Sequence, residues 1–233
     1  MTWHTQPMAA LDFESTGLDL ATDRIVTAAL WRIDPGARTK EATTWLADPG
    51  VEIPPEAAAI HGITTEHARE HGRPAAEVVA EIGAALERVV VDGLPVVIYN
   101  APYDLGLLSA ELERYGAGVS YFGQLRVVDP LVLDKQMDPY RRGGRTLVDV
   151  CAHHGVPLDE KQAHGASADA LAAARLAWKL GAAHPELAEM GLDDLHTAQV
   201  GWKADQAASF QAYLRRGRDP EAVIDGSWPL AKA

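Results

Sequence analysis

The alternation of apolar and polar residues changes character about a third of the way along the chain. Apolar, β-branched runs dominate the first part and predict strands at 8–14, 24–33 and 41–46. Asp-Pro-Gly turn sequences at 34–36 and 48–50 close the second and third runs. Because such connections are tight, we expect the three strands to form an antiparallel meander.

The second part of the chain alternates helical spacing with short apolar runs. Predicted helices span 74–90, 104–115, 131–136, 146–154 and 167–180, and predicted strands span 95–99 and 124–128. Strands followed by this alternation predict an α/β domain. Its sheet would be mixed, with the antiparallel meander followed by parallel strands, and helices would flank it.

A further helical stretch fills the C-terminal tail. Four of its residues are spaced to lie near one face: Trp202, Phe210, Tyr213 and Leu214. We expect this stripe to pack on the domain, the alternative being a docking helix for a partner. The predicted organisation is therefore a main α/β domain at 1–184 and a C-terminal helical extension at 185–233 packed on it.

Charge and composition narrow the possible partners. The 233 residues include 33 acidic and 21 basic side chains, for a formal charge of -12. The field of the whole molecule therefore repels polyanions, so a nucleic acid would have to be held locally. The single cysteine, Cys151, cannot form an internal disulfide. Without a signal-like leader or a bilayer-spanning apolar run, we expect a cytoplasmic protein with no membrane partner.

The first candidate for chemistry is a pair of acids on the first predicted strand. Asp12 and Glu14 are two positions apart, so the pleat directs both side chains to the same face near the end of the strand. Two adjacent carboxylates repel each other unless a proton or a cation lies between them. A hard divalent cation with oxygen ligands is the usual solution. Alone, such a pair is weak support for a metal site.

Two further acids stand at predicted helix starts. Asp104 follows the apolar strand at 95–99, where the helix dipole favours negative charge, although it could simply cap that helix. Asp169 lies in the first turn of a later helix, for which Ser167 is the predicted N-cap, and five positions after His164. Taken singly, Asp169 is an ordinary helix-start acid and His164 is one of nine histidines.

Together these residues form an ordered pattern of three motifs: Asp12-x-Glu14, Asn100-x-x-Tyr103-Asp104 and His164-x-x-x-x-Asp169. The pattern resembles the three exonuclease motifs of the DnaQ-like DEDDh family, which includes the polymerase III epsilon proofreading subunit, RNase T and oligoribonuclease. The resemblance covers about residues 9–180 and implies a ribonuclease H-like fold. Tyr103 is a mild departure, because phenylalanine is commoner at that position.

The resemblance implies hydrolysis with two metal ions. The acids that match the family motifs, Asp12, Glu14, Asp104 and Asp169, would bind two divalent cations, expected to be Mg2+ with Mn2+ able to substitute. Four carboxylates and two such cations balance in charge. The residue matching His164 is the general base for the attacking water, and an ordinary histidine pKa of about 6.5 suits that role near neutral pH. These five residues are the predicted catalytic set.

The predicted substrate-binding residues surround the first two motifs. They are Ser15, Thr16, Gly17, Leu18, His61, Asn100 and Tyr103. By resemblance, backbone groups of the turn at 15–17 hold the terminal sugar, and Leu18 packs against the last base. Ordinary core burial of Leu18 is an equally open alternative. His61 is more simply interpreted as a histidine at a helix end.

Two arginine clusters offer cations to a nucleic acid. Arg141, Arg142 and Arg145 lie in a glycine-containing loop, where they could contact phosphates or form an ordinary solvated loop. The cluster at 215–218 lies in the tail, where cations near the carboxyl end of a helix are commonplace.

The resemblance therefore implies a 3′-to-5′ exonuclease that acts on nucleic acid, with single-stranded DNA favoured. Within the same chemistry, an exoribonuclease or oligoribonuclease remains an alternative, because discrimination rests on contacts to the 2′ hydroxyl. A proofreading subunit active beside a polymerase is another, and a homodimer is equally open. A binding module that keeps the fold without catalysis is disfavoured, because all four acids and the histidine are present.

Overall fold

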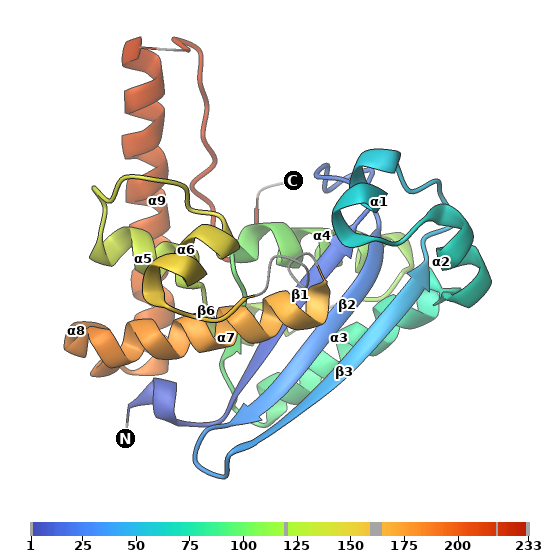
Figure 1. Cartoon of the computed structure of the whole chain (residues 1–233), viewed down its shortest axis with the longest axis horizontal. Coiled ribbons are helices and arrows are strands. Elements are labelled where there is room, and N and C mark those ends of the chain that lie inside the picture. The colour runs from blue at the N-terminus through green and yellow to red at the C-terminus, as the bar shows by residue number, and fades with distance from the viewer. Residues whose placement is uncertain (1, 119–120, 159–164, 218, 232–233) are drawn as a thin grey trace.

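The computed structural model describes residues 2–118, 121–158, 165–217 and 219–231, which centre on one six-stranded sheet (Figure 1). The strands are β1 (Met8–Ser15), β2 (Ile25–Asp34), β3 (Thr39–Asp48), β4 (Arg73–Pro74), β5 (Val96–Val97) and β6 (Val127–Val128). Their order across the sheet is β4-β3-β2-β1-β5-β6. β1, β2 and β3 pair antiparallel, whereas β5 and β6 extend the sheet in parallel with β1. The predicted meander and mixed sheet are both confirmed.

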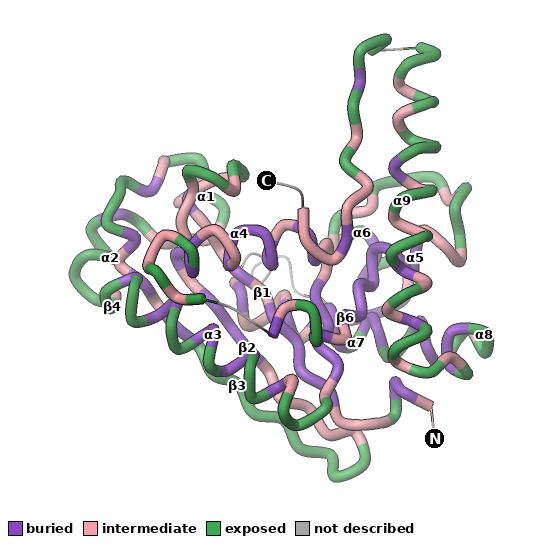
Figure 2. The backbone as a smooth tube through the Cα atoms, turned by 180° about the vertical axis from the view of Figure 1, so that it is seen from behind, coloured by how far each residue is buried: buried purple, intermediate pink, exposed green. Residues whose placement is uncertain are grey.

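Helices cover both faces of this sheet. The 3-10 turns are η1 (Trp3–Thr5) and η2 (Phe122–Gln124). The α-helices are α1 (Pro55–His61), α2 (Thr65–His71), α3 (Ala75–Val91), α4 (Ala101–Arg114), α5 (Pro130–Met137), α6 (Leu147–His154), α7 (Ala166–Ala183), α8 (Pro185–Ala188) and α9 (Leu192–Gly217). Figure 2 shows purple, buried backbone through the sheet and the inner helix faces, with green confined to the outside.

The alternation of side chains along β1 separates two apolar cores. Ala9, Leu11 and Phe13 pack with α3 and α4 on one face of the sheet. Met8 and Ala10 pack with α7 on the other face. The even-numbered positions of β1 therefore face α7, and this parity decides where the acids at 12 and 14 point.

Several local predictions need correction. α4 begins at Ala101 rather than at 104, because Pro102 in its first turn has a φ already suited to a helix. The predicted N-cap Ser167 is wrong: α7 begins at Ala166 after Gly165, and no side chain caps it. The short helices α1 and α2 were not predicted as elements, since seven residues are too few for a clear helical period.

The prediction that the tail stripe packs on the domain holds only near its start. Trp202 packs against both apolar cores, but Phe210 and Tyr213 are 51% and 54% exposed. A 26-residue helix is about 39 Å long, and its second half projects beyond the body of the domain in Figure 1. The segment at 219–231 returns beside it, where Gln211 accepts a hydrogen bond from the amide of Ile224.

No helix in the described part of the chain is long and apolar enough to cross a membrane.

Candidate active site

Three carboxylates converge where β1 ends and α7 begins. Asp12 and Glu14 extend from β1 on the face that α7 covers, and Asp169 lies in the first turn of α7. One oxygen from each of the three lies within 4.8 Å of the others. The indole of Trp31 on β2 donates to the carbonyl oxygen of Ser167 at 2.7 Å, which fixes the start of α7 against the sheet.

Asp104 approaches the same place from the other side of β1. It lies in the first turn of α4, is only 4% exposed, and accepts a hydrogen bond from the amide of Phe13 at 3.1 Å. The simpler reading, that Asp104 merely caps the helix, is wrong: the N-cap is Asn100. Its carboxylate is therefore bonded across to the strand that carries Asp12 and Glu14.

Burial and mutual repulsion disfavour the ionised forms of these acids. Burial raises the pKa of Asp12 well above its usual range, and the charges of Asp104, Asp169 and Glu14 raise it further. Burial, reinforced by Asp169, raises the pKa of Glu14 to about 7. Burial also raises the pKa of Asp104, although the Phe13 amide opposes this shift. Clustered carboxylate oxygens with raised pKa values fit a hard divalent cation.

The pKa of Glu14 predicts how stability depends on pH without metal. Glu14 ionises near pH 4.5 in the unfolded chain but only near pH 7 in the folded chain. The free energy of unfolding therefore falls as pH rises through this window, and it does not recover at higher pH. In chelator, Glu14→Gln should therefore be more stable than the parent at pH 8, by about 2 kcal/mol after allowance for partial exposure. That corresponds to roughly 5 °C in Tm by calorimetry. An advantage equal at pH 5 and pH 8 would contradict it.

The turn that follows β1 is fixed from two sides. The Tyr103 hydroxyl donates to the carbonyl oxygen of Gly17 at 2.6 Å, and the Thr16 hydroxyl donates to Asp23 at 2.7 Å. A Cβ at position 17 would lie 2.6 Å from an Asp23 side-chain oxygen, so a larger residue there would displace the carboxylate that accepts from Thr16. Ser15 also donates to the Gly17 carbonyl. The predicted sugar-binding turn is thus a rigid element beside the acid cluster.

Two predicted substrate contacts have contrasting surroundings. Leu18 is 85% exposed, so the alternative of core burial is wrong. His61 ends α1, as predicted; its Nδ1 accepts a hydrogen bond from the Ile63 amide at 3.2 Å, and its ring lies near the backbone of Ser15. Burial lowers its pKa. The structure thus brings the His61 imidazole to the turn after β1, whereas the predicted base, His164, lies outside the described residues.

Asp129 supports the site and was missed by sequence reasoning. It is fully buried just before α5, and its carboxylate accepts hydrogen bonds at 3.0 Å from the amides of Asn100, Ala101 and Leu131. Burial raises its pKa while these bonds oppose the shift. Asn100 has a left-handed backbone with φ of 61°, which such bonds can stabilise. Asp129 therefore positions the helix start that carries Asp104.

The C-terminal tail also contacts this support. The indole of Trp228 donates to Asp129 at 3.2 Å, and the side chain of Gln199 on α9 accepts from the Asp129 amide at 2.7 Å. Both residues are buried. The extension is therefore connected by hydrogen bonds to the start of α4.

The loop arginines are held by a buried acid. Asp134 on α5 accepts from Arg141 at 2.7 Å and also pairs with Arg145 and with His154. Burial alone would raise the pKa of Asp134, but these partners outweigh it and hold the pKa below its usual value. The side chains of Arg141 and Arg145 are only 10% and 15% exposed. A solvated loop is thus wrong for these two arginines, and only Arg142 of the three is exposed.

Comparison with known proteins identifies the class of protein that has this fold and this cluster of acids. A mixed sheet flanked by helices, with acids gathered at the end of its first strand, is the arrangement of a ribonuclease H-like nuclease. The family model described as an exonuclease of the RNase T type matches residues 9–177. The chain belongs to this RNase T and DnaQ-like exonuclease family.

Individual relatives are distant. An exonuclease of Escherichia phage 186 is 33% identical, over 72% of this chain and 84% of its own length. The DNA polymerase III subunit epsilon of Pasteurella multocida is 24% identical over 72% of this chain. The chain spans 63% of that protein and 42% of the Haemophilus influenzae epsilon subunit.

Solved structures agree on the fold. E. coli exonuclease I in complex with a dT13 oligonucleotide has a TM-score of 0.65 at 21% identity, with 78% of this chain and 42% of that chain covered. Exonuclease I from Methylocaldum szegediense has a TM-score of 0.62 at 23% identity, with 89% of this chain and 46% of that chain covered. At this identity the likeness establishes the architecture only.

Proposed function

We propose that this chain is a metal-dependent 3′-to-5′ exonuclease that releases nucleoside 5′-monophosphates, with single-stranded DNA as the favoured substrate. The observation that carries the proposal is the convergence of Asp12, Glu14 and Asp169 within 4.8 Å, with Asp104 bonded to the same strand. The exonuclease family supports hydrolysis of a phosphodiester. The direction and the preferred strand are the finer parts of the proposal.

The donor set fits two Mg2+ ions, for which Mn2+ would substitute. Asp12, Glu14, Asp104 and Asp169 would hold them, since all four offer hard oxygen ligands and their mutual repulsion is relieved by cations. Such a pair of ions supplies charge stabilisation to the entering and leaving oxygens of an in-line displacement.

The other predicted residues bind the terminal nucleotide or accept the proton of the attacking water. His164 accepts the proton of the attacking water and must be neutral to do so. The rigid turn of Ser15, Thr16 and Gly17 holds the terminal sugar, and the exposed side chain of Leu18 packs against the last base. Tyr103 fixes that turn, while Asn100 begins the helix of Asp104. His61, at the same turn, contacts the terminal nucleotide.

The choice of substrate is supported by the names of similar proteins. One solved relative is exonuclease I bound to a DNA oligonucleotide, and several curated relatives are subunits of a DNA polymerase. RNA remains the alternative substrate, because both chemistries attack the same phosphodiester. A polymerase partner is a second proposal, supported by the epsilon relatives and by the exposed Phe210 and Tyr213 on α9.

Matched digestions test the proposal. A 5′-labelled single-stranded DNA should shorten one nucleotide at a time in Mg2+, whereas a 3′-labelled strand should release its label as a mononucleotide at once. Chelator should abolish both reactions. Duplex DNA and an RNA of the same sequence, at fixed salt, rank the substrates. Release of the 5′ label first would contradict the polarity, and faster digestion of the RNA would favour the exoribonuclease.

A further inference from the structure

A second feature of the molecule lies beyond the acid cluster, on α5, α9 and the loop that joins α5 to α6. We propose that this surface binds the single strand upstream of the terminal nucleotide, with Tyr140 stacking on a base and with Arg142, Lys135 and Lys203 contacting phosphates. We call it the upstream surface. It deepens the proposed function, on which it rests, by assigning a single-stranded substrate to this chain.

The α5–α6 loop presents an aromatic ring beside a cation. Tyr140 is 93% exposed, and Arg142 two positions later is also exposed. An exposed aromatic side chain adjacent to arginine is the combination that holds unpaired bases, because any base can stack on a ring. Only a single strand offers such a base without the cost of breaking a pair.

The loop is held in place rather than loosely solvated. Asp134 pairs with both Arg141 and Arg145, which flank Arg142. The Tyr99 hydroxyl donates to the carbonyl oxygen of Arg145 at 2.7 Å, and Tyr99 immediately precedes Asn100 at the start of α4. The loop is thus bonded to the residue that precedes the start of α4, the helix that carries Asp104, and its exposed side chains are presented from a fixed backbone.

Two lysines continue the positive charge onto neighbouring helices. The side chain of Gln206 on α9 donates to the carbonyl oxygen of Val132 on α5 at 3.0 Å. Lys203 precedes Gln206 by about one turn and Lys135 follows Val132 by about one turn. The charge of Lys203 acts on Lys135, so the two cations are neighbours. Burial lowers the pKa of Lys135, and the charges of Lys203 and Arg145 lower it further, against the buried acids Asp129 and Asp134.

This cluster is unusual for a chain with a formal charge of -12. Within the residues that the structure describes, Lys135, Arg142 and Lys203 form no ion pair with a carboxylate. Repelling cations next to one another are stabilised by an anion, and a phosphate chain supplies one at each nucleotide. α5 and α9 lie side by side in Figures 1 and 2, as the bond between Gln206 and Val132 requires.

Binding in chelator tests the surface without any turnover. We expect Tyr140→Ala to weaken the binding of a labelled dT16 strand about 10-fold in fluorescence anisotropy. The double variant Lys135→Gln/Lys203→Gln should weaken it further and reduce the salt dependence, with a slope smaller by roughly 1.4. A matched duplex should bind more weakly to the parent and be insensitive to Tyr140→Ala.

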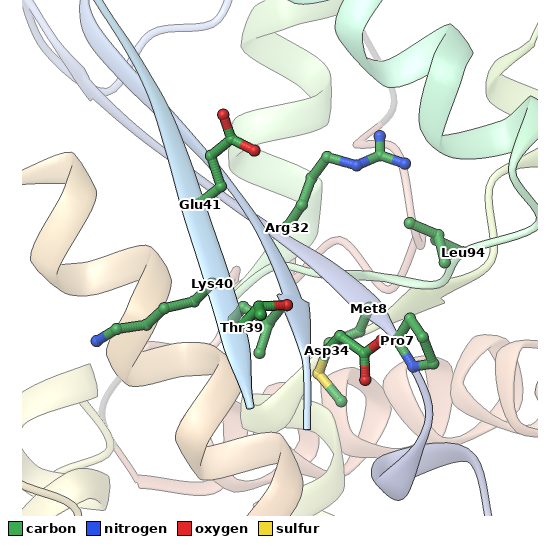
Figure 3. A pocket seen from close by; sticks show the side chains of 9 residues that line it. Pro7, Met8, Arg32, Asp34, Thr39, Lys40, Glu41 and Leu94 are labelled. Atoms are coloured by element: carbon green, nitrogen blue, oxygen red, sulfur yellow. The ribbon is translucent and has the colours of Figure 1, made fainter. Parts of the chain in front are cut away.

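Two control variants match these changes elsewhere. Tyr213→Ala removes an exposed tyrosine from the distal part of α9. Lys40→Gln removes an exposed lysine from the hollow shown in Figure 3, which lies at the opposite end of β1 from the acids and has Pro7, Thr39 and Leu94 in its lining. Both controls should bind dT16 like the parent. Equal weakening by Tyr140→Ala and Tyr213→Ala would overturn the proposal.

Digestion distinguishes failure of the upstream surface from failure of the proposed function. The upstream surface predicts that Tyr140→Ala raises KM for a 16-mer about 10-fold at unchanged kcat but leaves a dinucleotide unaffected, because the shorter substrate ends before the surface. If the parent bound dT16 through Tyr140 yet hydrolysed nothing, the proposed function would fail while the surface stood. If it hydrolysed both lengths and Tyr140→Ala changed neither, the surface would fail alone.

Discussion

Replacing Asp12 with asparagine should lower kcat by about three to four orders of magnitude. The Asp12 carboxylate has the charges of all three other acids close to it, and it is the group most dependent on a cation for its ionised form. Loss of one charged ligand removes several kcal/mol of charge stabilisation, and each 1.36 kcal/mol is worth tenfold in rate. Steady-state digestion of single-stranded DNA in Mg2+ measures the effect.

The same substitution should have the opposite effect on stability. In chelator at pH 8, Asp12→Asn removes a repelled charge, so its Tm should exceed that of the parent. Adding Mg2+ should then raise the Tm of the parent but not that of the variant. Glu113→Gln, an exposed acid on α4, is the matched control and should change neither rate nor Tm. Full activity of Asp12→Asn in Mg2+ would refute the metal assignment.

The sequence alone predicted those features of the site that depend on local periodicity and on position within an element. The spacing of Asp12 and Glu14 required both side chains to leave β1 on one face, and the structure places both beside Asp169. Asp104 and Asp169 each lie in a first helical turn. These features depend on strand parity and on helix starts, which short stretches of sequence specify.

The supporting contacts could not be predicted in this way. Asp129 bonds to Asn100, 29 positions earlier, and to Trp228, 99 positions later. Neither separation belongs to a helical or strand period, so only the folded chain brings the three together. The sequence -Asp129-Pro130- signalled no more than a helix start, and Asp129 does cap α5 as well.

The projecting half of α9 shows a related limit of prediction from helical periodicity. The stripe of Trp202, Phe210 and Tyr213 correctly indicates one helical face, but a period carries no information on how far the opposing surface extends. Trp202 meets the domain, whereas Phe210 and Tyr213 lie beyond its edge. The burial of Arg141 and Arg145 could not be predicted for a similar reason, because their buried partner Asp134 lies outside the loop, on α5.

The positions of the acids depend on hydrogen bonds that fix the starts of α4 and α7. β1 carries two of the acids, α4 and α7 carry one each, and the starts of these helices are fixed by Asp129 and Trp31 respectively. The tail adds Trp228 to the first of these contacts. A site built at the starts of two helices gains favourable dipoles for its carboxylates, but it depends on accurate positioning of those helices.

Replacing His164 with alanine should lower kcat by about two to four orders of magnitude while leaving metal binding intact, because general-base catalysis contributes about that factor. The Tm increase on adding Mg2+ should equal that of the parent, in contrast to Asp12→Asn. In the parent, kcat/KM should fall tenfold per pH unit below about 6.5, since only the neutral imidazole accepts a proton. This limb should be absent from the residual activity of His164→Ala.

His153→Ala supplies the matched control, since His153 is an exposed histidine on α6 whose ring contacts only that of His154 among the described aromatic side chains. Its pH profile and rate should match those of the parent. The comparison discriminates between two ways in which the loss of His164 could act. A base contributes to the rate and its pH dependence alone, whereas a residue that organises the carboxylates would lose the Mg2+-dependent Tm increase together with turnover. The second outcome would transfer the role of base away from His164 and leave the acids as the sole assigned catalytic groups.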